Sequence, residues 1–229
     1  MKVERALTTV AWNFGVASKP QSDAVFLLLI AQGDRHAMHM LFARYRTRVY
    51  RYAQRLTNND ATAQDLVNDV FLEVWRHAAK FDGRSQVATW LLGITRNLAV
   101  TILRRRPTQR LDQTIADSVP DPADDPEVMM GKMQRNSILA ACLTKLSAPH
   151  REIIDLVYYH EKSVSEVAEI TGIPRNTVKS RMFYARKEIA ERLKEFGVHG
   201  FDQRSSVLDL LTGERAMLSS RRLAIGPSN

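Results

Sequence analysis

The sequence has 229 residues, with 33 Lys or Arg against 25 Asp or Glu, so its formal net charge is +8. A chain of this length holds one domain or two small ones, and the excess of positive charge favours an anionic partner such as nucleic acid or an acidic membrane surface. Hydrophobic residues make up 45% of the chain, which argues against global disorder. A single cysteine, Cys142, excludes an internal disulfide, so a disulfide-stapled secreted domain is ruled out.

The sequence also predicts neither membrane insertion nor export. The longest clean apolar run, residues 24–31, is less than half the length of a membrane span. Polar residues interrupt the apolar stretch near the N-terminus, so no export signal is predicted there. We therefore expect a cytoplasmic protein with no membrane insertion.

The first half of the chain shows helical periodicity. Residues 24–30 predict a short opening helix, and three longer helices follow, whose apolar stripes begin at Met38, Leu66 and Trp90. The candidate N-caps of these three helices are Asp34, then Asn59 or Asp60, then Ser85. No segment alternates apolar and polar residues between turn signals, which predicts an all-α fold without a sheet.

Helical periodicity stops between Pro107 and Gly131. This stretch contains four prolines, and its six acidic residues against one arginine give it a net charge of −5, which is typical of an extended linker. Helical spacing resumes near Lys132. Ser147 is the candidate cap of the helix that follows it. We predict five segments: a flexible N-terminal extension (1–22), a helical domain (23–106), an acidic linker (107–131), a smaller helical domain (132–196) and a C-terminal tail (197–229).

The strongest local motif is a helix-turn-helix over residues 163–193. Ser163 and Glu166 have the spacing of a capping box, in which each side chain satisfies a free backbone N–H group. Gly172 suits the left-handed conformation of a sharp turn. Pro174 suits the first turn of the next helix, and Ile173 can fill the angle between the two helices. The buried stripe of the second helix is predicted to contain Val178, Met182, Ala185 and Ile189.

The opposite side of that second helix is basic. Residues 173–196 hold seven basic and three acidic residues, a net charge of +4, and all three acids lie in the later turns. This polarity suits a helix whose first turns enter a major groove of DNA. An ordinary helical hairpin with a solvated basic face is the alternative that the spacing leaves open.

Together the two helical domains resemble bacterial sigma factors of the extracytoplasmic-function (ECF) class of the sigma-70 family. The polymerase-docking helix of that family resembles residues 65–75, DLVNDVFLEVW. Its −10 region is similar to residues 81–85, 89–99 and 104–106, and its −35 domain is similar to residues 146–152, 166–168 and 177–186. The resemblance covers residues 23–196 in the family's order, and the linker stands where the family has one.

This resemblance implies two small helical domains joined by an extended linker, the first being sigma region 2 and the second sigma region 4. It further implies a factor that binds core RNA polymerase and directs promoter-specific transcription initiation under the control of an anti-sigma factor. The implied partners are core RNA polymerase, promoter DNA (the −35 element as duplex and the −10 element as single strand) and an anti-sigma factor.

Three sets of contact residues follow from the resemblance. The polymerase-binding set combines an acidic row at i, i+4 and i+8 with neighbouring apolar area: Asp65, Asp69, Val70, Glu73 and Trp75. The −10 set is Phe81, Arg84, Ser85, Arg96, Asn97, Arg104 and Arg105. The −35 set is Arg175, Asn176, Thr177, Lys179, Ser180, Arg181, Phe183 and Arg186. Phe71 and Trp75 lie beside the acidic row, and they could belong either to the docking surface or to the core. Trp90 could stack on a base, but its apolar spacing favours a place in the core.

Enzymatic activity and cofactors are not expected. The sequence has no Gly-rich phosphate loop, nucleophile elbow or Cys/His triad. His36 and His39 are three residues apart on one helix and could both bind a metal ion, but no Cys or further His lies near them in sequence, so a solvated or core pair is favoured.

Two other functions remain open. One is a sigma-like decoy that sequesters an anti-sigma factor, and the other is a plain helix-turn-helix transcription regulator. The basic recognition helix argues against a decoy, because a decoy needs no DNA contacts. The polymerase-docking segment argues against a simple regulator.

Overall fold

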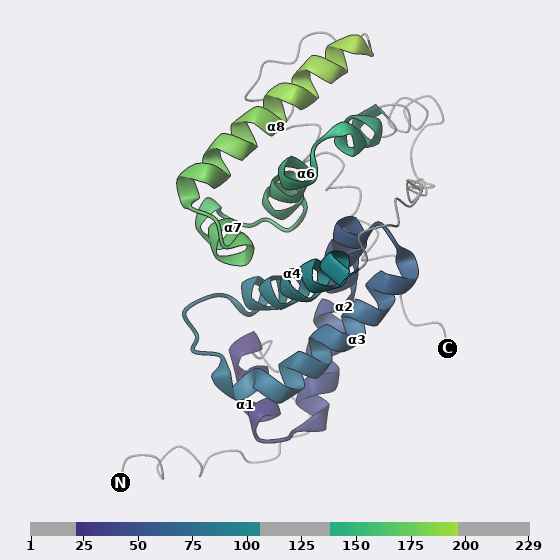
Figure 1. Cartoon of the computed structure of the whole chain (residues 1–229). Coiled ribbons are helices and arrows are strands. Elements are labelled where there is room, and N and C mark those ends of the chain that lie inside the picture. Colours follow the sequence, from purple (N-terminus) through teal and green to yellow (C-terminus); the bar gives the residue numbers. More distant parts are fainter. Residues whose placement is uncertain (1–21, 106–137, 197–229) are drawn as a thin grey trace, which may run out of the picture.

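The computed structural model describes residues 22–105 and 138–196, and within these ranges it contains helices and no strand (Figure 1). The N-terminal bundle comprises α1 (Asp23–Ala31), α2 (Arg35–Thr57), α3 (Asp60–His77), the short η1 (Ala78–Lys80) and α4 (Val87–Arg105). The C-terminal bundle comprises a helical segment at 138–145, α6 (Ala148–Ile154), η2 (Asp155–Tyr159), α7 (Val164–Thr171) and α8 (Arg175–Glu195). The all-α prediction is confirmed. The predicted extension, the predicted linker at 107–131 and the predicted tail lie outside the described residues.

Local capping sets the limits of the N-terminal helices. The carboxylate of Asp34 accepts hydrogen bonds from the backbone N–H groups of His36 and Ala37 at 2.8 and 3.1 Å, and the side chain of Asn59 accepts one from Thr62. Both residues are N-caps, as predicted. The prediction of Ser85 as a cap is wrong: α4 begins at Val87, so Gln86 stands before its first residue and its carbonyl accepts from the backbone of Trp90.

The core of the N-terminal bundle lies where α2, α3 and α4 pack against one another, with α1 against α2. Its centre is formed by fully buried aliphatic side chains of three helices, including Leu41, Val70 and Leu91. These residues belong to the stripes that the helical spacing indicated. Burial of each side chain of this size contributes roughly 2 kcal/mol to the stability of the fold. The apolar stripes therefore account for the packing of the three helices against one another.

The helix-turn-helix forms as its local signals indicate. Ser163 and Glu166 make both hydrogen bonds of the capping box at the start of α7, and Gly172 ends that helix with a φ of 69° in the left-handed region. Pro174 differs from the prediction by one position, because it occupies the N-cap of α8 and does not enter the first turn. Val178, Ala185 and Ile189 of α8 are fully buried, and Met182 is half-buried.

A widened turn follows α6. The helix that begins after Ser147 changes at Asp155 into the π-helical η2, which ends at Tyr159 with His160 as its C-cap, and Glu161 then adopts a positive φ of 57°. The π turn brings the side chains of Asp155 and His160 to face each other, with Nε2 and Oδ2 3.4 Å apart, and both are almost fully buried.

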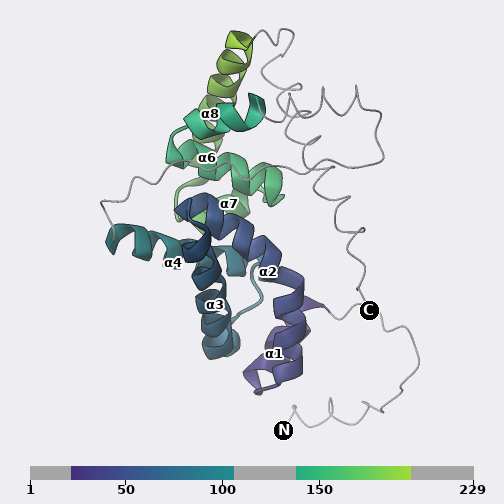
Figure 2. The same cartoon turned by 90° about the vertical axis from the view of Figure 1, so that its right-hand side faces the viewer.

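The two bundles pack on each other through α4 and α7 (Figures 1 and 2). In both views the C-terminal bundle lies at one end of the molecule, with α4 at the junction. One apolar cluster crosses the junction: Tyr52 and Leu92 of the N-terminal bundle are buried together with Ile153, Leu156 and Val167. In the part of the chain that the structure describes, no helix combines the length and apolarity that crossing a membrane requires.

Candidate nucleic-acid interface

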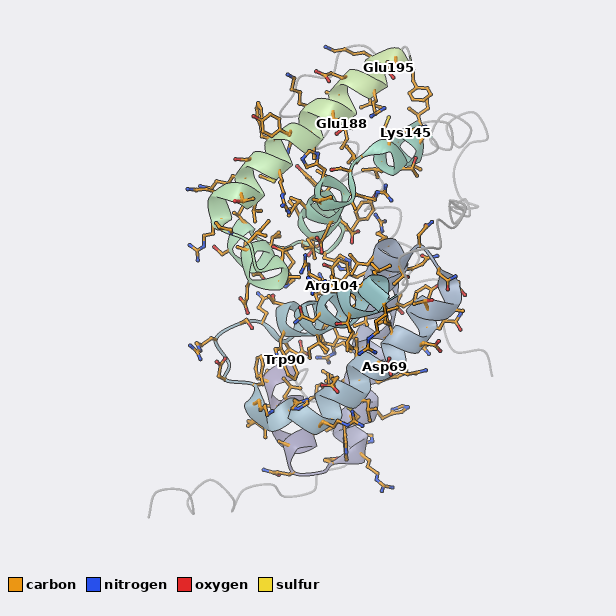
Figure 3. The ribbon with its side chains drawn as sticks, viewed as in Figure 1. Asp69, Trp90, Arg104, Lys145, Glu188 and Glu195 are labelled. Carbon is orange, nitrogen blue, oxygen red and sulfur yellow. The ribbon has the colours of Figure 1, made fainter. Side chains whose placement is uncertain are left out.

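The outer face of α3 carries the predicted acidic row. Asp65 and Asp69 are exposed, and Asp69 lies on the open side of the helix (Figure 3). Glu73 is partly covered, because its carboxylate accepts from Arg76 at 3.3 Å and pairs with His77 at 3.0 Å. Three acids on one helical face, two of them exposed, form a surface that can pair with a basic helix.

Apolar side chains border this acidic row, but they differ in part from those predicted. Val70 is fully buried in the core and offers no surface to a partner, so its assignment to the docking set is wrong. Trp75 is 37% exposed and Leu72 is 45% exposed. Sequence reasoning missed Leu72, although its spacing of three residues from Asp69 places it on the same face.

The loop before α4 carries one part of the −10 set. Gly83 has a φ of 74°, and the next residue, Arg84, donates from its backbone N–H and from Nε to the carboxylate of Asp82 at 3.0 and 2.6 Å. These bonds lower the pKa of Asp82. Arg84 itself remains almost fully exposed. Phe81 packs against the ring of Trp90, with 5.4 Å between centroids, and both rings lie against the core.

The remainder of the −10 set is spread along α4. Asn97, Arg104 and Arg105 are exposed, and the last two lie in the final turn of the helix. Figure 3 shows Arg104 at this end of α4. At 1.5 Å per residue, the helix places Arg105 roughly 27 Å from Val87, so the structure does not bring the arginines of the final turn near Arg84. The set forms an extended basic track and not a compact pocket.

The −35 set lies on α8, with its most exposed members in the first turns. Arg175, Asn176, Lys179, Ser180 and Phe183 are exposed, whereas Thr177 and Arg181 are half-buried. Sequence reasoning missed Tyr184, which is 58% exposed and forms an edge-to-face pair with Phe183. The only sequence signal for it was a second aromatic residue next to Phe183.

Arg186 occupies a different environment from the rest of the −35 set. Its Nε donates to the hydroxyl of Tyr158 at 2.7 Å, and its guanidinium lies 5.7 Å from the centre of the same ring. These contacts join α8 to η2. Arg186 therefore braces the recognition helix, in addition to any contact it makes with DNA.

The −10 loop and the start of α8 meet at one cleft, about 560 Å³ in volume. The loop contributes Arg84, Ser85 and Gln86, and the helix-turn-helix contributes Ser163, Glu166 and Arg175. Members of both predicted DNA-binding sets thus line a single space between the two bundles.

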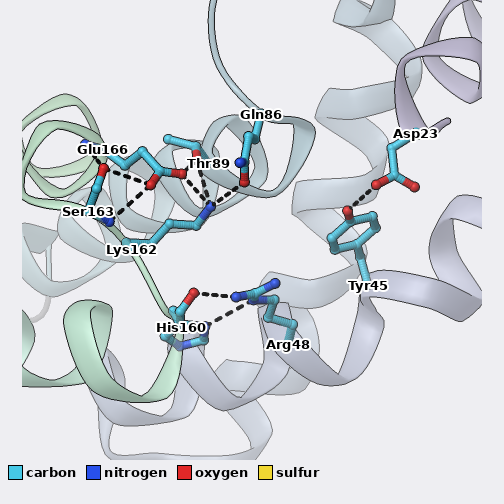
Figure 4. Close-up of polar contacts among 9 residues, drawn as sticks. All are labelled: Asp23, Tyr45, Arg48, Gln86, Thr89, His160, Lys162, Ser163 and Glu166. Carbon is cyan, nitrogen blue, oxygen red and sulfur yellow. Dashed lines mark hydrogen bonds and ion pairs between the residues drawn. The ribbon is translucent and has the colours of Figure 1, made fainter.

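A polar network joins the two bundles at this cleft and includes three of its lining residues, Gln86, Ser163 and Glu166 (Figure 4). The ammonium group of Lys162 donates to Glu166, Thr89 and Gln86 at 2.7, 2.8 and 3.2 Å, and the hydroxyl of Thr89 donates to Glu166 at 2.7 Å. Burial opposes ionisation of Glu166, but the hydrogen bonds from Lys162, Thr89 and Ser163 outweigh it and lower its pKa to about 2.

No metal site emerges among the residues that the structure describes. His36 and His39 are both exposed on α2, and no group of three His, Cys, Asp or Glu side chains in the described chain is placed to hold a metal ion.

The comparisons with known proteins agree with this arrangement. Residues 41–108 match the family model described as sigma-70 region 2, and residues 137–193 match sigma-70, region 4. The ECF RNA polymerase sigma factor SigL of Mycobacterium tuberculosis is 30% identical over 169 residues, which cover 73% of this chain and 95% of SigL. The chain belongs to the ECF class of sigma-70 factors. The N-terminal bundle is called region 2 below, and the C-terminal bundle region 4, after the family regions that match residues 41–108 and 137–193.

Solved structures share the fold of this sigma factor. The structure of CnrH in complex with the cytosolic domain of CnrY matches with a TM-score of 0.56 and 22% identity, over 76% of this chain and 97% of that one. The sigma factor RpoE in complex with the anti-sigma factor NepR from Bartonella quintana matches with a TM-score of 0.54 and 24% identity, over 68% of this chain and 96% of that one.

Proposed function

We propose that this sigma factor binds core RNA polymerase through α3, contacts the −10 element with region 2 and contacts the −35 element with α8. The observation that carries the proposal is the order of the two family regions on one chain, each presenting exposed charged side chains of the sign its partner requires. The acidic face of α3 suits a protein partner with basic side chains, and the basic tracks on α4 and α8 suit DNA.

Docking on polymerase uses the face that contains Asp65, Asp69 and Glu73, with Leu72 and Trp75 beside it. Apolar side chains next to a charged row give affinity by burial, while the charges set the orientation of the partner helix. Val70 does not contact the partner; it packs α3 against the core of the bundle.

The −10 element is contacted as single strand. An unstacked base needs a pocket or an aromatic face and gains about 1–3 kcal/mol by stacking. Arg84, Ser85 and Phe81 form the loop that receives such a base, with Arg84 oriented by Asp82. On α4, Arg96 and Asn97 contact phosphates and base edges. Arg104 and Arg105 continue the positive charge to the end of the helix.

The −35 element is contacted as duplex by the first turns of α8. Phosphate contacts position a recognition helix and base contacts give specificity. The exposed residues Arg175, Asn176, Lys179, Ser180 and Phe183 lie where a helix enters the major groove, and the half-buried Thr177 and Arg181 flank them.

An anti-sigma factor is the proposed regulator. The similar RpoE structure holds the anti-sigma factor NepR, which supports a partner of this kind for the present chain. As part of this proposal, we infer that the factor works in the cytoplasm beside core polymerase and promoter DNA, without a cofactor and without catalytic activity of its own.

Run-off transcription tests the proposal. Core polymerase is incubated with and without the protein on a library of promoter fragments. Transcripts that start at defined sites and depend on the protein support the proposal. Binding of an anti-sigma factor without any transcript would indicate a decoy, and DNA binding without association with core polymerase would indicate a plain helix-turn-helix regulator.

A further inference from the structure

A pocket of about 390 Å³ opens between α2 and α3, on a part of region 2 to which the proposed function assigns no contact. The two helices lie side by side in both views of the molecule (Figures 1 and 2). The volume falls within the range of sites that hold small ligands, about 300–1,000 Å³. The lining of the pocket is shared between the helices: Phe42, Arg46, Thr47 and Tyr50 of α2, and Gln64, Val67 and Asn68 of α3.

The pocket is separate from the junction between the two regions. Its lining residues all belong to region 2. The junction uses other side chains of region 2, among them the buried Tyr52 and Arg96, which donates from Nε to Oε1 of Glu152 at 2.7 Å. Region 4, as far as the structure describes it, therefore contributes no side chain to the pocket.

Apolar side chains form part of the lining and are fixed by the core behind them. Val67 is 7% exposed, so it presents only a small apolar area to the pocket. The ring of Phe42 meets the buried ring of Phe71 edge to face, with 4.8 Å between centroids. This contact holds the orientation of Phe42, which packs on the core and also lines the pocket.

A carboxylate joins the two helices beside the pocket. Asp60 accepts hydrogen bonds from the hydroxyl of Tyr50 on α2 and from the amide of Gln64 on α3, the second at 2.7 Å. Both donors line the pocket, so these bonds fix two of its walls relative to each other. A pocket that is formed before its partner arrives costs less ordering when the partner binds.

The pocket adjoins the acidic row of α3. Successive residues of an α-helix are about 100° apart around its axis, so Asn68 lies roughly 60° from Asp65, with Leu72 between them. Leu72 is 45% exposed, and Asn68 is an exposed residue of the pocket lining. A partner helix that covers Leu72 therefore reaches the acidic row on one side and the pocket on the other.

The chemistry of the lining favours an apolar side chain of that partner. Phe42, Tyr50 and Val67 offer aromatic and aliphatic surface. Arg46 is exposed at the pocket and repels a cationic side chain, so the basic residues of the partner are directed to the acidic row. The guanidinium of Arg46 can also lie over the face of an aromatic occupant. Large apolar side chains that fill such pockets supply much of the affinity of protein interfaces.

We propose that this pocket is an anchor site for core RNA polymerase, and that it receives one large apolar side chain of the helix whose basic residues pair with the acidic row. The inference rests on the proposed function, because it takes the face of α3 as the docking surface. Core polymerase is the occupant because the pocket is continuous with that face. The docking surface thereby extends onto α2, through Phe42, Thr47 and Tyr50.

The test fills the pocket in the full-length protein. Thr47→Trp enlarges an exposed side chain of the lining, and Thr101→Trp makes the same replacement at an exposed position of α4. Fluorescence anisotropy of labelled sigma factor measures the affinity for core polymerase. We expect Thr47→Trp to bind at least about tenfold more weakly than the wild type, and Thr101→Trp to bind like the wild type. Thr47→Val keeps the size of the side chain and should also bind like the wild type.

Wild-type affinity of Thr47→Trp overturns the proposal and leaves the pocket to another occupant, such as an anti-sigma factor. An equal loss with Thr101→Trp or with Thr47→Val overturns it as well, because filling of the pocket would then not be the cause. If Thr47→Trp fails to fold by circular dichroism, Gln64→Trp fills the same pocket from α3 and is compared with Thr101→Trp.

Asp69→Arg separates the two levels of inference. Wild-type affinity of that variant for core polymerase defeats the proposed docking surface on α3, and the pocket proposal with it. Weak binding by Asp69→Arg together with wild-type binding by Thr47→Trp defeats only the pocket.

Discussion

The guanidinium of Arg186 on the recognition helix donates a hydrogen bond from Nε to the hydroxyl of Tyr158 in η2, at 2.7 Å. Tyr158 is 6% exposed, and Arg186 is half-buried above its ring. This contact ties the angle of α8 to the π turn that follows α6, so the DNA-facing helix is held by a residue at its midpoint as well as by its buried stripe.

Replacing Tyr158 by phenylalanine removes this bond and retains the ring. A buried hydrogen bond to a charged donor contributes about 1–2 kcal/mol, so Tyr158→Phe should lower the free energy of unfolding by that amount. Urea denaturation followed by circular dichroism measures the change. Tyr184→Phe is the matched control, because Tyr184 is exposed on α8, the helix that carries Arg186, and its variant should unfold like the wild type. Equal stability of the two variants would show that the bond does not brace α8.

Short-range features of the fold could be predicted from the sequence. The capping box of Ser163 and Glu166 and the left-handed Gly172 depend on neighbours within three or four residues, which the sequence displays directly. The apolar stripes of α2, α3 and α4 depend on helical periodicity, which is equally local. Periodicity does not state how deep a stripe residue lies, which is why Val70 was assigned to the docking surface although the core covers it.

The interface between the regions could not be predicted from the sequence. Arg96 and Glu152 are 56 residues apart in the chain, and no repeat or motif connects them. Lysine is usually found at the surface, so the sequence gives no sign that Lys162 is buried. Its ammonium group finds acceptors in Gln86 and Thr89 of the other region. The π turn at 155–159 also lacks a signal in the sequence: Asp155 pairs with Arg55 and His160 packs against the ring of Tyr52, and both partners belong to the other bundle.

The acidic face of α3 should be required for association with polymerase. Asp69→Arg reverses a charge at an exposed position, so the stability of the fold should change by no more than about 0.5 kcal/mol. Affinity for core polymerase should fall at least about tenfold, because the new charge repels a basic partner surface. Fluorescence anisotropy of labelled sigma factor titrated with core polymerase measures this loss.

Glu191→Arg is the control for that experiment. Its position on α8 is exposed and lies far along the chain from α3, so the affinity for core polymerase should remain at the wild-type value. An equal loss in both variants would mean that net charge, and not the face of α3, governs the association.

Lys179 should contribute to −35 binding through phosphate charge. Each phosphate contact that is lost changes the slope of log affinity against log salt by about 0.9. Lys179→Ala in the holoenzyme should therefore bind −35 duplexes more weakly, by a similar factor for all sequences, and with a slope reduced by about 1. Filter binding between low and moderate salt measures the slope.

The exposed Lys194, in the last turn of α8, supplies the comparison for Lys179. Lys194→Ala should leave both affinity and slope at the wild-type values, because the groove-facing residues are in the first turns. A sequence-dependent loss with Lys179→Ala, at an unchanged slope, would instead assign Lys179 to a base edge.

The stability of the protein should depend on pH through Glu166. Its pKa is about 2 in the folded protein against an ordinary value of 4.5. A carboxylate with a lowered pKa stabilises the fold fully above its unfolded pKa, and this contribution disappears as the pH falls from 4.5 towards 2. Between about pH 5.5 and pH 3.5 the wild type should lose roughly 1 kcal/mol more unfolding free energy than Glu166→Gln, which has no proton to bind at this position. Glu169→Gln, an exposed neighbour on α7, should follow the wild-type pH dependence. Parallel curves for wild type and Glu166→Gln would show that Lys162, Thr89 and Ser163 do not favour the ionised form of Glu166.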